Sequence, residues 1–83
     1  IRIDIDALKL PEVEINIYGA SDEICVVGEA TVRASIWILD EIVKKYELLR
    51  GKYSGYFRKR VVLVLYTLIP LLEVVKEAKE KDI

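Results

Sequence analysis

The sequence contains no histidine and no methionine, and it has a single cysteine, Cys25. The absence of histidine excludes zinc sites built on imidazole, and histidine general bases, from these 83 residues. One cysteine cannot form a disulfide within the chain, and its apolar neighbours predict a buried, inert thiol. Because the chain begins with Ile1 and lacks methionine, we expect it to be a piece of a longer protein.

Carboxamide side chains are almost absent, since Asn16 is the only asparagine and there is no glutamine. Few amides combined with many lysines and glutamates are typical of proteins from hot environments, and we expect a thermophilic source. The lone Asn16 lies in an apolar-alternating segment, between Ile15 and Ile17. An active site, the relic of one, and chance are the three explanations for its position.

Long hydrophobic runs are also absent. The longest, from Val61 to Leu72, is too short to span a bilayer, which needs about 20 residues. No signal-peptide pattern is evident, and we expect a cytoplasmic protein without membrane contact. A composition of 53% hydrophobic and 33% charged residues predicts one globular domain over residues 1–83.

The net charge of −1 hides an uneven distribution, because residues 1–29 carry seven acids and residues 48–72 carry none. Around residues 50–60, cations alternate with three aromatic side chains, which suits phosphate contacts and base stacking. This segment is also consistent with a solvated connection whose aromatic residues cover the edge of the core. The candidate nucleic-acid-binding residues are Arg50, Lys52, Arg58, Lys59 and Arg60.

Hydrophobic periodicity predicts three strands in the first part of the chain. Period-two alternation indicates strands at residues 1–6 and 12–18, separated by Leu10-Pro11, with a turn at residues 19–22. A third strand at residues 24–32 is expected to form a hairpin with the second. Its odd-numbered side chains, Glu29 among them, should share one face.

The second part of the chain predicts a helix, a strand and a further helix. Ser35 is the expected N-cap of a helix over residues 36–50, with Gly51 as its stop and residues 52–59 as a loop. The continuous apolar run at residues 61–66 predicts a central strand covered on both faces. Pro70 is expected in the first turn of the last helix, with four side chains directed inward: Leu71, Leu72, Val75 and Ala78.

The resulting order is β-β-β-α-β-α, an α/β fold with a mixed sheet. A helix between the third and fourth strands implies a right-handed crossover and a parallel pair of strands. The prediction is that residues 24–32 and 61–66 lie in one sheet, with the helix at residues 36–50 packed across it.

This order, with acids on neighbouring strands, resembles the core of the PD-(D/E)XK nuclease superfamily, which includes restriction endonucleases and archaeal Holliday-junction resolvases. The segments that carry the resemblance are EINIYG, EICVVGEATVR, RKRVVLVLYT and EVVKEAKEKDI. They look like archaeal nuclease-like domains that read E-x-D-[IV]-x-G, then V-G-E-[AV]-K, and end in a VIY strand and an AKExGI helix. The likeness covers residues 12–83. It implies a restriction-endonuclease-like core and an archaeal source.

In such nucleases an Asp on one strand and a Glu on the next bind Mg²⁺, which prefers oxygen ligands. A lysine two residues after the Glu helps to position the attacking water and to stabilise charge on the phosphate. Matching the pattern puts the Asp position at Asn16, the Glu position at Glu29 and the Lys position at Thr31. The resemblance therefore implies catalytic roles for these three positions, and metal binding by Glu29 and Asn16.

Two of these three positions depart from the pattern. Asn16 is a neutral ligand with one carbonyl oxygen, and Thr31 supplies no positive charge. Glu14, or Glu12 beyond it, is on the same strand face as Asn16 and could supply the missing carboxylate. Each has a structural alternative, since both glutamates also suit the solvated face of an edge strand.

The missing positive charge also has candidate replacements. Lys44 or Lys45 on the following helix could bring an ammonium to the site, because migration of the motif lysine onto that helix is known in the superfamily. Arg33 shares the face of Glu29. Alternatively, the two lysines belong to a solvated helix face, and Glu29 pairs with Arg33 at an exposed strand end.

We predict a nuclease-like domain derived from metal-dependent DNA endonucleases, with a degenerate active site. The resemblance implies Mg²⁺ as its cofactor and DNA as its partner. The alternative is a catalytically inactive module of the same fold that binds nucleic acid or protein, or forms a homodimer. A small structural α/β module with no nucleic-acid role is the third interpretation. The changed motif residues leave enzymatic activity open.

Overall fold

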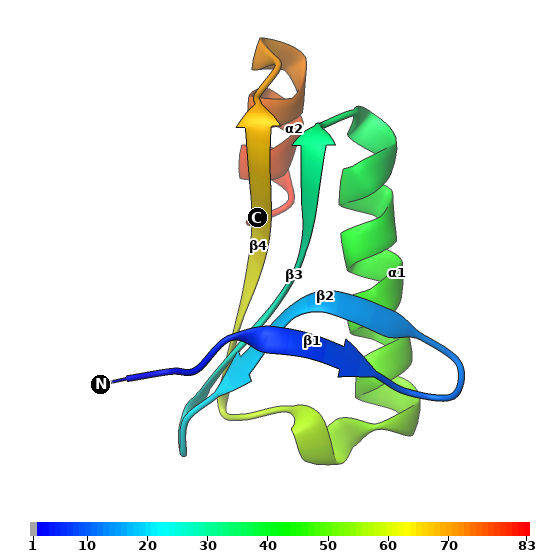
Figure 1. The fold of residues 1–83 in the computed structure, drawn as a ribbon, viewed down its shortest axis with the longest axis vertical. Coiled ribbons are helices and arrows are strands. Elements are labelled where there is room, and N and C mark those ends of the chain that lie inside the picture. Colours follow the sequence, from blue (N-terminus) through cyan, green and yellow to red (C-terminus); the bar gives the residue numbers. More distant parts are fainter. Residues whose placement is uncertain (1) are drawn as a thin grey trace.

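The computed structural model describes residues 2–83 as a four-stranded sheet with two α-helices on one face (Figure 1). The predicted order β-β-β-α-β-α is confirmed. A short 3₁₀ turn, η1, follows the first helix. The elements are β1 (Asp6–Lys9), β2 (Glu14–Ala20), β3 (Ile24–Arg33), α1 (Ile36–Lys52), η1 (Ser54–Tyr56), β4 (Arg60–Ile69) and α2 (Leu72–Glu80).

The strands lie in the order β1-β2-β3-β4. β1 and β2 are antiparallel, as are β2 and β3, whereas β3 and β4 are parallel. The parallel pair is the one predicted from the intervening helix. The predicted third strand is confirmed and extends to Arg33, and α1 packs across the sheet as expected.

Two clusters of buried side chains hold the helices against the sheet. Near the C-terminal end of α1, Leu49 packs on residues from β2 and β3: Ile15, Cys25 and Val27. Near its N-terminal end, Leu39 packs with Ala34 and with Val74 of α2. Cys25 is buried with its thiol free, as its apolar neighbours predicted.

The predicted strand at residues 1–6 is wrong, because β1 begins at Asp6 and residues 2–5 precede it. Ile1 lies outside the described residues. The segment at residues 3–5 crosses Gly19, where a Cβ atom would come within 2.6 Å of Ile5 Cδ1. Alternation of apolar and polar residues does not determine where an edge strand begins to pair. Here residues 3–5 pack against Gly19 and do not form strand pairs with β2. β2 likewise runs two residues later than predicted, so the turn contracts to residues 21–23.

α1 begins at Ile36 with Ser35 as its N-cap, as predicted, but its C-terminal end differs from expectation. Ser35 occupies the N-cap of α1, but its side chain makes no capping hydrogen bond. Gly51 does not end α1, which continues to Lys52, and Tyr53 caps it by donating its N–H to Leu49 O. A glycine stops a helix when it adopts positive φ, and Gly51 does not.

The last helix begins later than predicted. Pro70 lies outside α2 and precedes its N-cap, Leu71. The rotation of the helix also differs, since Val74 is buried while Leu72 is exposed. Val74 packs with Leu39 of α1, and Ala78 packs against the same cluster as predicted.

The prediction that the fourth strand is central and covered on both faces is wrong. β4 is at the end of the sheet, and only the face towards the helices is covered (Figure 1). On the other face, Tyr66 and Leu68 remain 61% and 64% exposed. A continuous apolar run predicts apolar surroundings on both faces, but two helices on one side cannot provide them.

Candidate functional site

An irregularity in β2 creates the candidate site. Tyr18 pairs with Asp6 of β1, but Ile15 pairs with Leu8, so β2 has one more residue than its partner across this interval. Such a bulge changes the face on which the following side chains lie. Ile15 and Tyr18 therefore both contact the core although three positions separate them. Asn16 lies within this bulge.

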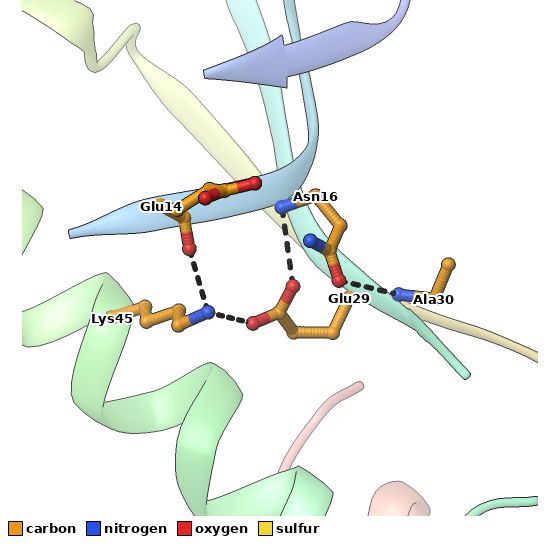
Figure 2. A network of polar contacts seen from close by, with 5 residues as sticks. All are labelled: Glu14, Asn16, Glu29, Ala30 and Lys45. Carbon is orange, nitrogen blue, oxygen red and sulfur yellow. Dashed lines mark hydrogen bonds and ion pairs between the residues drawn. The ribbon is translucent and has the colours of Figure 1, made fainter. Parts of the chain in front are cut away.

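Asn16 bridges the bulge to β3 through its backbone and its side chain (Figure 2). Its N–H donates to Glu29 Oε2 over 3.1 Å, and its Oδ1 accepts the N–H of Ala30 over 3.5 Å. In a regular antiparallel pair of strands, both of these N–H groups would donate to backbone carbonyl oxygens of the neighbouring strand. The pairing of β2 with β3 ends at Ile17 and Gly28, and the carboxamide supplies an acceptor for the Ala30 N–H beyond it, which gives the only asparagine a structural role.

The second oxygen of Glu29 contacts Lys45 of α1, whose Nζ also donates to the carbonyl oxygen of Glu14 over 2.6 Å (Figure 2). The Glu29 side chain is 4% exposed and that of Lys45 is 21% exposed. Burial of a carboxylate is costly unless charge and hydrogen bonds compensate it. The Lys45 ammonium and the Asn16 N–H provide that compensation, one at each oxygen.

The structure brings together some of the predicted site residues and separates others. Glu14 contributes its backbone carbonyl to the network. Thr31 is on the Glu29 face of β3, but its hydroxyl donates to Arg33 O over 3.3 Å. Of the two lysines predicted as alternatives, Lys45 contacts Glu29, whereas Lys44 is exposed. The pairing of Glu29 with Arg33 is wrong, since Lys45 takes that place.

Helical spacing could have identified Lys45. Ile42 and Leu49 are buried core residues, and Lys45 lies three positions after the first and four before the second. Side chains at these spacings share one face of a helix. Lys45 is therefore on the inward stripe of α1, whereas Lys44 is on the solvated side.

The donors present do not fit a divalent cation as they are arranged. Mg²⁺ needs several oxygen ligands in octahedral geometry. Within residues 2–83 no three acidic or cysteine side chains lie close enough together to hold an ion. Glu29 supplies one carboxylate, and an ammonium already contacts it.

Two of the five basic residues predicted to contact nucleic acid make contacts within the chain. Lys52 Nζ pairs with Glu12 over 2.6 Å, and this hydrogen bond raises the pKa of Lys52. Arg58 donates to the carbonyl oxygens of Ser21 over 2.8 Å, of Phe57 over 3.0 Å and of Gly55 over 3.2 Å. The three remaining predicted nucleic-acid contacts are exposed: Arg50, Lys59 and Arg60.

The aromatic residues of this segment pack inward. All three cover the core beside Leu49, and Phe57 stacks on Tyr46 with ring centroids 5.3 Å apart. The hydroxyl of Tyr18 donates to Tyr56 O over 2.5 Å, and burial raises the pKa of Tyr18. The interpretation that these rings cover the core edge is therefore the one that the structure supports, rather than base stacking.

A family model described as "Domain of unknown function (DUF8196)" matches residues 1–83. The chain belongs to this family. DUF8196 carries no stated activity, so the match adds no role to Glu29, Asn16 or Lys45. The searches of curated proteins and of solved structures found no match. None of the helices formed by residues 2–83 has the length and apolar character needed to cross a membrane.

Proposed function

We propose that this chain is a nuclease-like domain in which the former metal position is closed by an ion pair, and that it acts as a protein-binding module. The single observation behind this proposal is the state of the Glu29 carboxylate. One oxygen contacts the Lys45 ammonium and the other accepts the Asn16 N–H. A cation that used this carboxylate would have to displace Lys45 and leave its ammonium without a partner.

Protein is favoured over nucleic acid as the partner because of the surfaces that remain exposed. The aromatic side chains that could stack on bases cover the core, and two of the five basic residues make internal contacts. In contrast, the face of β3 and β4 away from the helices carries exposed apolar side chains. Large exposed apolar patches are typical of protein interfaces.

A second candidate is a Mg²⁺-dependent endonuclease in which Lys45 replaces the lysine of the motif. The observation in its favour is the contact of Lys45 with Glu29 from the following helix. In that mechanism metal binding would release Lys45 towards the phosphate. It would also require a second carboxylate, for which Glu14 is the nearest candidate along β2.

Cleavage of supercoiled and branched DNA by the purified chain, with Mg²⁺ or Mn²⁺, separates these two candidates. We expect no cleavage, and no calorimetric signal for either metal. The matched variants are Glu29→Gln, which removes the charge at the same volume, and Lys44→Met, which changes an exposed neighbour of Lys45. Metal-dependent cleavage that Lys44→Met retains and Glu29→Gln abolishes would overturn the proposal in favour of the endonuclease.

A further inference from the structure

The outer edge of β4 lacks the features that keep sheet edges apart. β4 has ten residues, and no other strand within residues 2–83 pairs with this edge. Between Val61 and Ile69 it contains no charged residue and no proline. Natural proteins protect edge strands with short length, charge or proline. β1, at the opposite edge, has four residues and includes both Asp6 and Lys9.

The side chains next to this edge are also apolar and exposed. Val62, Tyr66 and Leu68 lie on the face away from the helices and are 40%, 61% and 64% exposed. Val32 of β3 extends the same surface. A strand added at the edge of β4 would therefore gain backbone hydrogen bonds and cross-strand apolar contacts together.

Backbone direction fixes which residues of β4 face outward. Arg60 donates its N–H to Glu23 O over 2.9 Å, towards β3. Because successive residues of a strand point their hydrogen-bonding groups to opposite sides, the outward groups belong to the odd-numbered residues. The N–H of Ile69 already donates to Thr67 Oγ1 over 3.3 Å. The pair at the two ends of the ladder, Val61 with Ile69, is therefore incomplete. The outward residues of β4 run from Val61 to Ile69 and are centred on Leu65, with Leu63 and Thr67 on either side.

We propose that the chain forms a homodimer in which two β4 strands pair antiparallel about a two-fold axis at Leu65. Leu65 then pairs with Leu65 of the second copy, and Leu63 with its Thr67. On the outer face Val62 lies beside Leu68 of the second copy. This inference names the partner in the proposed binding function, and it rests on that function only in this respect.

A second copy suits this edge better than a charged partner would. The paired segment contains no charge that an identical strand would have to neutralise. The ends are complementary, since Arg60 begins β4 and Glu73 follows its end in the first turn of α2. Antiparallel pairing brings the Arg60 end of one copy to the Glu73 end of the other. The sheet then continues through both copies as eight strands, four from each.

Sedimentation equilibrium of the 83-residue chain tests the dimer and its register. We expect about 19 kDa, twice the 9.5 kDa of one chain. The variant V62K/L68K places Lys opposite Lys at both ends of the pairing and should be monomeric. The variant V62K/L68E places Lys opposite Glu at the same positions and should remain dimeric. Trp37→Lys, at an exposed apolar residue of α1, should leave the dimer intact.

A wild-type chain that stays monomeric up to about 1 mM, where even weak complexes are populated, would overturn the dimer. Equal behaviour of the two double variants would overturn the register. Oxidation of V62C/L68C gives a second readout, since this pair should form a covalent dimer and V62C/Y66C should not. Failure here leaves the DNA-cleavage result unchanged, so the dimer and the loss of cleavage are tested separately.

Discussion

The ammonium of Lys45 contacts the carboxylate of Glu29, and this ion pair joins α1 to β3 beside the bulge in β2 (Figure 2). The same ammonium donates to Glu14 O, and the same carboxylate accepts the N–H of Asn16. Three elements thus meet at one buried charge pair. Its removal should affect the docking of the helix as well as the local strand geometry.

Lys45→Met should destabilise the fold by about 3 kcal/mol, because it leaves the Glu29 carboxylate buried without its cation. The double variant E29L/K45M should cost less than the sum of the two single changes, since no buried charge then remains. Urea unfolding followed by circular dichroism measures both. Lys44→Met is the matched control and should change stability by less than about 0.5 kcal/mol. Equal effects of the two lysine changes would contradict the role of Lys45.

Asn16→Asp tests whether the bulge retains the position of a metal ligand. The new carboxylate can still accept the Ala30 N–H, but it adds a second negative charge beside Glu29. We expect lower stability without metal and a rise in melting temperature on addition of Mn²⁺. Asn16→Ala should lose about 1 kcal/mol, the usual value of one hydrogen bond, and should not respond to metal. An Asn16→Asp variant that Mn²⁺ does not stabilise would exclude a metal position here.

The sequence predicts the element order, the parallel strand pair and the helix packed on it, because each depends on long, strongly periodic segments. The start of β1 could not be predicted in the same way. Residues 1–6 alternate regularly, yet residues 3–5 lie across Gly19. That contact depends on tertiary packing and has no signal in local periodicity.

The candidate site was predictable in part. Glu29 stood out as a carboxylate in an otherwise apolar strand, and its burial decides against the alternative of an exposed strand end. The role of Asn16 depends on the bulge, which the sequence does not mark with a glycine or proline. Lys45 could have been distinguished from Lys44 by its spacing from Ile42 and Leu49. The exposure of one face of β4 could not have been predicted, since an apolar run has the same sequence whether or not a partner covers it.

Gly28 is required by the close approach of β4. A Cβ atom at this position would clash with the carbonyl oxygen and side chain of Val64. Because a backbone atom cannot rotate away, we expect Gly28→Ala to destabilise the fold by about 3 kcal/mol, as overpacking of a core does. Gly55→Ala is the control, since nothing lies within 4 Å of the added methyl group. Urea midpoints compare them, and similar values for both would contradict the close approach.

Tyr18 should make stability fall at high pH. Burial raises the pKa of its hydroxyl, although the positive charge of Arg58 acts in the opposite sense, and the neutral form donates to Tyr56 O. A group whose pKa is raised on folding contributes stability that is complete below its unfolded pKa of about 10 and is lost as the pH rises through the folded value. We therefore expect the stability difference between wild type and Tyr18→Phe to be constant from about pH 7 to 9 and to shrink above about pH 10. Urea unfolding of both proteins across this range measures it, and the shared titration of the other tyrosines and lysines cancels in the difference. A difference that stays constant to about pH 11 would show that the hydroxyl is not held neutral by the fold.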